Sequence, residues 1–226
     1  MNGFLTTPRT CLLLATLAFL LSPLLAVAGE DDWEHITESE GVQLYQRDAQ
    51  KVDGIAFRGI IETDLHIGQV IAVMLDAEER THWVYRQAEA EALEEGEPNQ
   101  RWSERYWVRV DMPFPATDRD YIFHTEYELR SEDRTVIADL ESVEDSRKPE
   151  QDCCVRAQSY THYTVEALPG EERTRITLEV EVDLGGRLPG WITRGARRDW
   201  PVETLTALVE RAREADVYPD VADWHD

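Results

Sequence analysis

Two strand patterns of this chain are joined by the sequence Met112-Pro113-Phe114-Pro115-Ala116-Thr117-Asp118-Arg119-Asp120-Tyr121. Proline fixes the φ angle and has no amide hydrogen, so Pro113 and Pro115 cannot lie in a central strand. They predict a stiff, partly apolar loop. The strands on either side of it therefore form an antiparallel hairpin.

Polarity alternates along the strands on both sides of this loop. The apolar faces carry Tyr106, Val108, Val110 and Met112 before the loop, and Tyr121, Phe123, Thr125, Tyr127 and Leu129 after it. Residues 176–184 alternate most strictly, with Val180 and Val182 on the apolar face and Glu179 and Glu181 on the other. Such alternation indicates an antiparallel sheet with one face toward a core and one toward water.

Helical patterns come before and after these strands. In chain order we expect a short helix at 31–38, strands at 42–47 and 56–63, helices at 65–75 and 77–83, strands at 106–112, 121–129, 136–140, 155–167 and 176–184, and a final helix from Leu188. Asp64 is the expected cap of the 65–75 helix. Pro201 lies inside the final helical pattern, which predicts a kink or a restart there. The tail at 216–226 can pack locally through Tyr218 or Trp224.

This order predicts an α+β fold in which a curved sheet wraps one long amphipathic helix. The apolar side of that helix, from Val202 through Leu205 and Leu208 to Ala212, faces inward. A sheet and a helix arranged in this way enclose a volume, and apolar cavities of this kind are where ligands usually bind.

The first 28 residues are predicted to be a signal peptide. The apolar segment Cys11–Leu25 is followed by Ala26-Val27-Ala28, a small-x-small pattern that places the cut after Ala28. An uncleaved membrane anchor is the alternative, but Cys11–Ala28 is near the lower length limit for spanning and Pro23 interrupts it. We therefore expect an exported, periplasmic domain at 29–226, with its core at about 33–215.

The chain is strongly acidic, with 46 Asp and Glu residues against 23 Lys and Arg residues and a net charge of −23. Loss of the predicted leader removes only Arg9 and makes the net charge −24. Nucleic acid is excluded as a partner because no basic surface is expected. Permanent docking on an anionic membrane is disfavoured for the same reason, which leaves room only for transient membrane contact.

Two adjacent cysteines, Cys153 and Cys154, follow the leader. Neighbours in sequence do not reach ordinary disulfide geometry without strain, so two free thiols are favoured over a vicinal disulfide. The cysteine spacing does not suggest a metal site, and no histidine lies at helical metal-binding spacing with another ligand. We expect no metal and no cofactor.

Five local motifs follow one another in an informative order. They are Gly41-Val42-Gln43-Leu44-Tyr45, Arg80-Thr81-His82-Trp83, Pro113-Phe114-Pro115 with Arg119-Asp120-Tyr121, Val155-Arg156 with Tyr160 and Tyr163, and Asp183-Leu184-Gly185-Gly186-Arg187-Leu188-Pro189-Gly190-Trp191. In this order the chain resembles the START (StAR-related lipid-transfer) domain over about 33–215. The resemblance implies the helix-grip fold, with a lipid- or sterol-sized ligand in an internal apolar cavity. The loop at 113–118 and the C-terminal helix would act as the gate.

Strand alternation assigns the side chains that face this cavity. The expected ligand-binding residues are Tyr106, Val108, Val110, Tyr121, Phe123, Thr125, Tyr127, Val180 and Val182, and the expected gate residues are Phe114 and Trp191. Alternation alone favours a solid core, and the set of motifs reverses that interpretation in favour of a cavity.

One departure from the family concerns the polar end of the ligand. Some sterol-binding relatives place an acidic side chain and an arginine opposite each other inside the cavity, and these places fall near Tyr106 and Thr125 here. Neither is charged, so a sterol is not supported, and hydroxyl groups such as that of Tyr127 would meet a polar head group. Arg119 and Asp120 are expected to be structural and to tie the loop to its surroundings.

The sequence favours a binding protein over an enzyme. The motif patterns GxSxG, HExxH, GxGxxG and the Walker loop do not occur. A cyclase- or dehydratase-like enzyme of the same superfamily is one alternative, and it would need an arginine, a histidine or a carboxylate inside the cavity. An envelope interaction module with a solid core is the other. We expect a monomer that binds a lipid or another hydrophobic small molecule.

Overall fold

A single curved sheet dominates the computed structural model, which describes residues 32–170 and 172–225. The predicted signal peptide and its cleavage site lie outside the described residues. The strands are β1 (Glu34–Ser39), β2 (Val42–Asp48), β3 (Ile55–Thr63), β4 (Gln87–Glu94), β5 (Arg101–Val110), β6 (Asp118–Arg130), β7 (Thr135–Ser142), β8 (Cys154–Arg156), β9 (Gln158–Leu168) and β10 (Arg173–Asp183). Their order in the sheet is β1-β2-β3-β10-β9-β7-β6-β5-β4, and β8 pairs with β6 in parallel.

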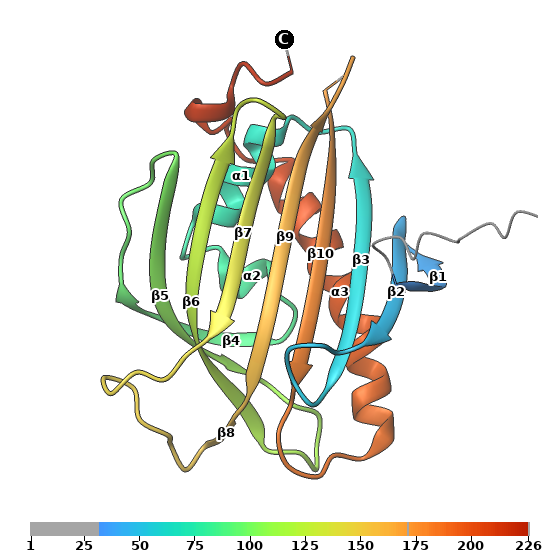
Figure 1. Cartoon of the computed structure of the whole chain (residues 1–226), viewed down its shortest axis with the longest axis vertical. Helices are drawn as coiled ribbons and strands as arrows, with labels where there is room; N and C mark the ends of the chain where they lie inside the picture. The colour runs from blue at the N-terminus through green and yellow to red at the C-terminus, as the bar shows by residue number, and fades with distance from the viewer. Residues whose placement is uncertain (1–31, 171, 226) are drawn as a thin grey trace, which may run out of the picture. The chain divides into compact units, whose positions relative to one another are not determined.

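Helices cover one face of this sheet (Figure 1). They are α1 (Ile67–Leu75), α2 (Arg80–Trp83), α3 (Gly190–Ala212) and the 3-10 turn η1 (Pro219–Val221). The long helix α3 packs on β2, β3 and β10, and α1 and α2 pack on α3. This confirms the predicted α+β fold, a curved antiparallel sheet with a long C-terminal helix against it.

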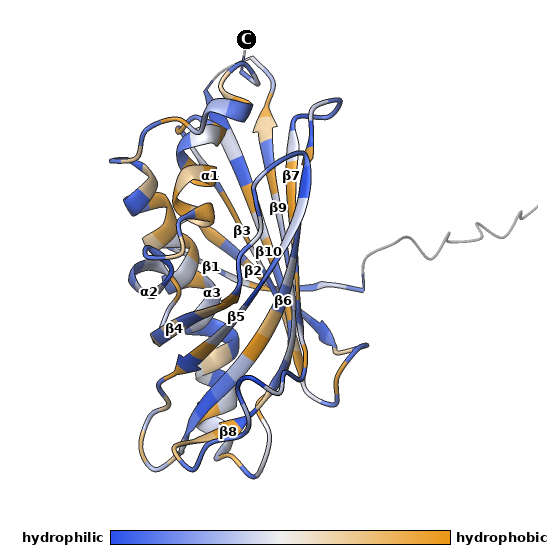
Figure 2. Ribbon diagram, turned by 90° about the vertical axis from the view of Figure 1, so that its left-hand side faces the viewer, coloured by the Kyte–Doolittle hydropathy of each residue, from blue (hydrophilic) through white to orange (hydrophobic). Residues whose placement is uncertain are grey.

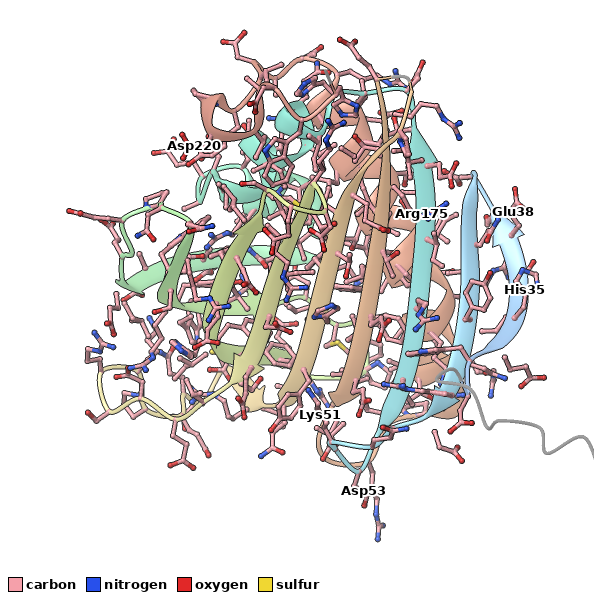
Figure 3. The ribbon with its side chains drawn as sticks, turned by 45° about the horizontal axis from the view of Figure 1, so that its top comes forward. His35, Glu38, Lys51, Asp53, Arg175 and Asp220 are labelled. Carbon is pink, nitrogen blue, oxygen red and sulfur yellow. A yellow bond between two sulfur atoms is a disulfide. The ribbon has the colours of Figure 1, made fainter. Side chains whose placement is uncertain are left out.

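The core lies between the helices and the concave face of the sheet, where apolar residues gather (Figure 2). Ile176, Leu178 and Val180 of β10 are buried there, as their alternation predicts. The outer face carries charged side chains such as Arg175 (Figure 3). Glu181 also lies on the outer face, but it is buried there. Arg47 and the backbone amides that follow β2 cover it and leave only 4% of it exposed.

Helix α3 runs without interruption through Pro201, where a kink or a restart was expected. Pro201 is buried against β3 at Gly59. A Cβ atom at Gly59 would lie 2.9 Å from Leu205 Cδ1 and 3.2 Å from Pro201 Cβ, so glycine allows this close approach without displacing either side chain. The absent side chain therefore fixes the distance between the helix and the sheet.

Several local predictions were wrong. The segment predicted as a helix at 31–38 forms strand β1, and strand β4 was not anticipated. The strand expected at 155–167 is divided into β8 and β9, and the second short helix begins at Arg80 instead of Ala77. The cap of α1 is His66 instead of Asp64, since its side chain accepts from the Gly68 amide.

The two adjacent cysteines also differ from the expectation. Cys153 and Cys154 are joined by a vicinal disulfide, where free thiols were favoured. They lie at the start of β8, beside the first residues of β6. The C-terminal tail, by contrast, packs as anticipated: Trp224 is buried, and Tyr218 lies against the core.

Candidate ligand-binding cavity

A cavity of about 300 Å³ lies between the sheet and the first half of α3. Its wall is mostly apolar. The side chains that line it include Phe57, Val108, Val110, Tyr121, Phe123, Val180, Val182, Leu184, Trp191, Ile192, Ala196 and Trp200. Met112 and Pro113 of the β5–β6 loop complete the wall at the mouth. We call this space the outer cavity.

A second space of about 60 Å³ lies deeper in the core. This inner cavity is lined by side chains from α1, α2 and the central strands, including Met74, Arg80, Trp83, Tyr106, Tyr127, Ala138 and Tyr163. Five residues line both spaces and so lie between them: Val84, Gln87, Phe123, Thr161 and Trp200. The ring of Phe123 stacks on that of Tyr121, with centroids 5.4 Å apart. The two cavities are therefore neighbours that share part of their walls.

Eight of the nine predicted ligand-binding residues line one or both cavities. Tyr106 and Tyr127 line the inner cavity, Phe123 lines both, and Val108, Val110, Tyr121, Val180 and Val182 line the outer cavity. Thr125 lines neither, although it is fully buried on the same strand. Strand alternation thus identified the inward face correctly but not which inward positions meet open space.

The two expected gate residues occupy different positions at the mouth. Trp191 lines the outer cavity and is 49% exposed. Phe114 is 92% exposed and does not line the cavity, whereas its neighbour Pro113 does. The aromatic ring at the tip of the loop therefore faces solvent.

A buried ion pair closes the inner end of the cavity. Arg80 donates to the carboxylate of Glu104 and to the hydroxyl of Tyr127 at 3.3 Å, and Tyr127 donates to Glu104 at 2.8 Å. The guanidinium group of Arg80 also lies 4.3 Å from the centroid of the Tyr106 ring. The sequence prediction named only hydroxyl groups in this region, and the structure adds a neutralised charge pair among them.

The sequence contained an indication that each member of this pair faces the core. Arg80 belongs to one of the five motifs but was given no role. Glu104 is two residues before Tyr106, on the same face of the strand, and it was missed because the strand was predicted to begin at Tyr106 when β5 begins at Arg101. An earlier strand start would have placed a carboxylate on the inward face.

Burial and neighbouring charges change the pKa values of Arg80, Tyr106 and Tyr127. Burial would by itself lower the pKa of Arg80, but the two tyrosines and Glu104 beside it outweigh burial and raise that pKa. Burial raises the pKa of the Tyr106 and Tyr127 hydroxyls, against the opposing effect of Arg80. Arg80 is therefore always cationic here, and both phenols stay protonated at neutral pH.

Arg119 holds the two loops of the mouth together. It donates to the carbonyl of Leu184 at 2.6 Å, to that of Gly185 at 2.9 Å, and to that of Thr117 in its own loop. The next residue, Asp120, accepts from the indole of Trp107 and from Arg156, each at 2.8 Å. Arg119 and Asp120 are thus structural, as expected: Arg119 joins the β5–β6 loop to the β10–α3 connection, and Asp120 joins β6 to β5 and β8.

The part of the chain that the structure describes shows neither of two other kinds of site. It contains no cluster of three or more His, Cys, Asp or Glu side chains suited to a metal ion. None of its helices is both long enough and apolar enough to span a membrane.

Comparison with known proteins gives a consistent result. A family model described as START domain matches residues 22–214. An uncharacterized protein of Pseudomonas aeruginosa is 27% identical over 198 residues, covering 86% of this chain and 95% of that protein. The phosphatidylcholine transfer protein of Bos taurus is 24% identical over 183 residues, covering 79% of this chain and 83% of that one.

A solved structure shows the same fold. The crystal structure of a STAR-related lipid transfer protein fragment from Xanthomonas axonopodis gives a TM-score of 0.69 at 24% identity. The match covers 81% of this chain and 100% of the fragment.

Proposed function

This chain belongs to the START domain family, and we propose that it holds a lipid or another hydrophobic molecule in the cavity between its sheet and α3. Lipid binding and transfer is the activity to which the family and the relatives point in general. The observation that carries the proposal is the outer cavity itself, an apolar space at the lower end of the usual range of about 300–1,000 Å³ for ligand sites.

The ligand would lie with its apolar part in the outer cavity. There Val108, Val180 and Val182 from the sheet face Ile192 and Ala196 from α3, and these side chains offer only van der Waals and hydrophobic contacts. Rotation of the Phe123 ring would join the outer cavity to the inner one and lengthen the available space. An extended, flexible hydrocarbon chain fits such a pair of connected spaces.

A polar group of the ligand would lie at the inner end. Arg80 and Glu104 already neutralise each other there, so a further charge on the ligand would lack a free partner. Two buried donors that line the inner cavity, Gln87 Nε2 and Trp83 Nε1, have no acceptor among the described residues. Because buried donors are costly when unsatisfied, the inner end favours a neutral oxygen acceptor such as a carbonyl or a hydroxyl group.

The gate in this proposal consists of the 113–118 loop and the N-terminal part of α3. Both line the mouth of the outer cavity, and Arg119 ties them together. Export of the domain at 29–226 to the periplasm is part of the same proposal, and its support is the leader pattern in the sequence.

An enzyme of the same superfamily is the second candidate, because Arg80 and Glu104 supply charged groups beside the inner cavity. Their mutual hydrogen bonding favours a structural role over acid–base work. Variants of these two residues that bind the ligand but lose turnover of a cyclisation or dehydration substrate would favour the enzyme.

The proposal is tested by native mass spectrometry of residues 29–226 purified from an exporting host, with organic extraction of whatever is bound. We expect a discrete added mass that extraction identifies as a lipid. Ala196→Phe, which fills the outer cavity from α3, should abolish the added mass, and Glu179→Gln on the outer face should not. An unliganded mass for the wild-type chain, with no uptake from an offered lipid panel, would contradict the proposal.

A further inference from the structure

One segment of this acidic chain carries positive charge and no negative charge. No Asp or Glu occurs between Asp183 and Asp199, and the residues between them include four arginines, Arg187, Arg194, Arg197 and Arg198. A chain with twice as many acidic as basic residues has a low chance of producing such a segment by composition alone. The segment covers the β10–α3 connection and the first turns of α3.

These four arginines differ from most others in the molecule. Arg58, Arg109 and Arg175, for example, form ion pairs with carboxylates on neighbouring strands. Within residues 32–170 and 172–225, none of the ion pairs includes an arginine of the 187–198 segment. Arg187, Arg194 and Arg198 are exposed, so their charges are directed to solvent without a protein partner.

The segment lies at the mouth of the outer cavity. Trp191, Ile192 and Ala196 of the same turns line that cavity together with Met112 and Pro113. Figure 1 shows the β10–α3 connection and the β5–β6 loop at the same end of the sheet, away from the C-terminus. Positive charge and the opening to the ligand space thus occur together.

Exposed aromatic side chains occur at this end as well. Phe114 and Trp191 are two of the four large apolar side chains that are exposed in the described residues. The 112–117 loop carries no charge, and the acids beside it are paired with Arg109, which binds both Asp111 and Asp118. On α3, the exposed Asp199 directly follows Arg198 and also lines the outer cavity. We call the surface formed by Phe114, Trp191, Arg187, Arg194 and Arg198 the mouth patch.

We infer that the mouth patch docks the protein reversibly on a bilayer that contains anionic lipid. Arginine side chains are attracted to anionic head groups, and aromatic rings insert at the interface between head groups and hydrocarbon. At about 0.1 M salt, charges more than roughly 10 Å away are screened, so the distant acidic surface does not cancel the attraction of the patch. The inference rests on the proposed function, because docking at the mouth opens the cavity toward the bilayer.

An anionic membrane therefore attracts the mouth patch and repels the rest of the protein surface. The net charge of −23 keeps other faces away from an anionic surface and disfavours lasting adsorption. The acidic composition disfavours only permanent docking, and the mouth patch specifies the orientation of the transient contact. Rapid release after a lipid has been exchanged follows from the same balance.

Vesicle flotation tests the inference with residues 29–226, which include the whole compact unit from Trp33 onward. The vesicles contain phosphatidylcholine alone or phosphatidylcholine with phosphatidylglycerol. We expect binding only to the second kind, with loss at high salt. Each basic residue near an anionic surface is worth about fivefold in partitioning, so the combined variant Arg187→Gln, Arg194→Gln and Arg198→Gln should bind about a hundredfold more weakly.

A matched control changes the same number of charges elsewhere. Arg101→Gln, Arg173→Gln and Arg175→Gln together remove three exposed arginines that are ion-paired on other surfaces, and partitioning should stay within about twofold of wild type. Equal loss in both triple variants, or wild-type binding that ignores phosphatidylglycerol, would overturn the inference. Failure here is separable from failure of the proposed function, because mass spectrometry of the mouth variant should still find bound lipid.

Discussion

Replacing Arg80 by methionine should destabilise the protein by removing the cation of a buried ion pair while keeping the length and apolar contacts of the side chain. The Arg80 side chain is 7% exposed and that of Glu104 is 18% exposed. Loss of one partner from a buried pair typically costs about 3–5 kcal/mol. Glu104 keeps its hydrogen bond from Tyr127 and some contact with water, which places the expected loss near the lower end, at about 3 kcal/mol.

This magnitude is within reach of ordinary unfolding experiments. In a domain of this size, about 1 kcal/mol changes Tm by roughly 2–4 °C, so Arg80→Met should lower Tm by about 6–12 °C. Urea denaturation should give a lower midpoint with an unchanged m-value, because the surface exposed on unfolding is the same. Arg101→Met, which breaks the exposed pair with Glu128, is the matched control and should change the free energy of unfolding little.

The double variant Arg80→Met with Glu104→Leu tests whether the loss of stability in Arg80→Met comes from the unpaired charge of Glu104. Replacement of both charges by apolar groups leaves no buried charge alone, and such replacements are often neutral or stabilising. The buried Tyr127 hydroxyl loses both of its partners in this variant, so we expect a loss of about 1–3 kcal/mol, well below the sum of the two single losses. The reasoning is refuted if Arg80→Met is as stable as wild type, or if the losses of the two single variants simply add.

Three further changes test other parts of the structure. Burial would raise the pKa of Glu181, but two backbone amides and Arg47 hold that pKa below the usual 4.5. The stabilisation by the Glu181 carboxylate is therefore complete above pH 4.5 and is lost as the pH falls through the lower folded pKa. Glu181→Gln should accordingly lower the free energy of unfolding by about 1.5–3 kcal/mol at pH 7. If Glu181→Gln lowers the free energy of unfolding as much at pH 3 as at pH 7, this reasoning is wrong. Arg119→Gln should speed amide hydrogen exchange in the two mouth loops together, and exchange confined to one loop would argue against their coupling. Trp224→Ala should cost about 3 kcal/mol in urea denaturation, and a negligible loss would show that the tail is not part of the core.

The sequence was sufficient for the fold because the fold depends on strongly patterned segments. Residues 176–184 alternate without exception, and the two prolines at 113 and 115 force a loop between two strands. Such patterns reflect a buried face and a backbone constraint, both of which act locally. They therefore predict the central strands and the long helix well.

Edge strands and buried polar contacts were harder to predict for physical reasons. Strand β4 is almost fully exposed. Its alternating residues are alanine and glutamate, which are depleted in strands, so the sequence gives no clear strand signal there. Glu104 pairs with Arg80 from α2, and the charge of each residue predicts a surface position until the partner is known. A contact between two segments that are distant in the chain cannot be predicted from the residue pattern of either segment alone.

The position of β10 has a consequence for when the molecule can fold. This last strand of the chain lies between β3 and β9, and it pairs Thr174 with Thr63 and Val182 with Ile55. Until β10 is available, strands β1–β3 share no neighbour with the remaining strands, and the sheet exists as two unconnected halves. Pairings this distant in sequence carry a high contact order and form late relative to hairpins. The ligand space therefore forms only when nearly the entire polypeptide is available for folding, as the proposed export of an unfolded chain would require.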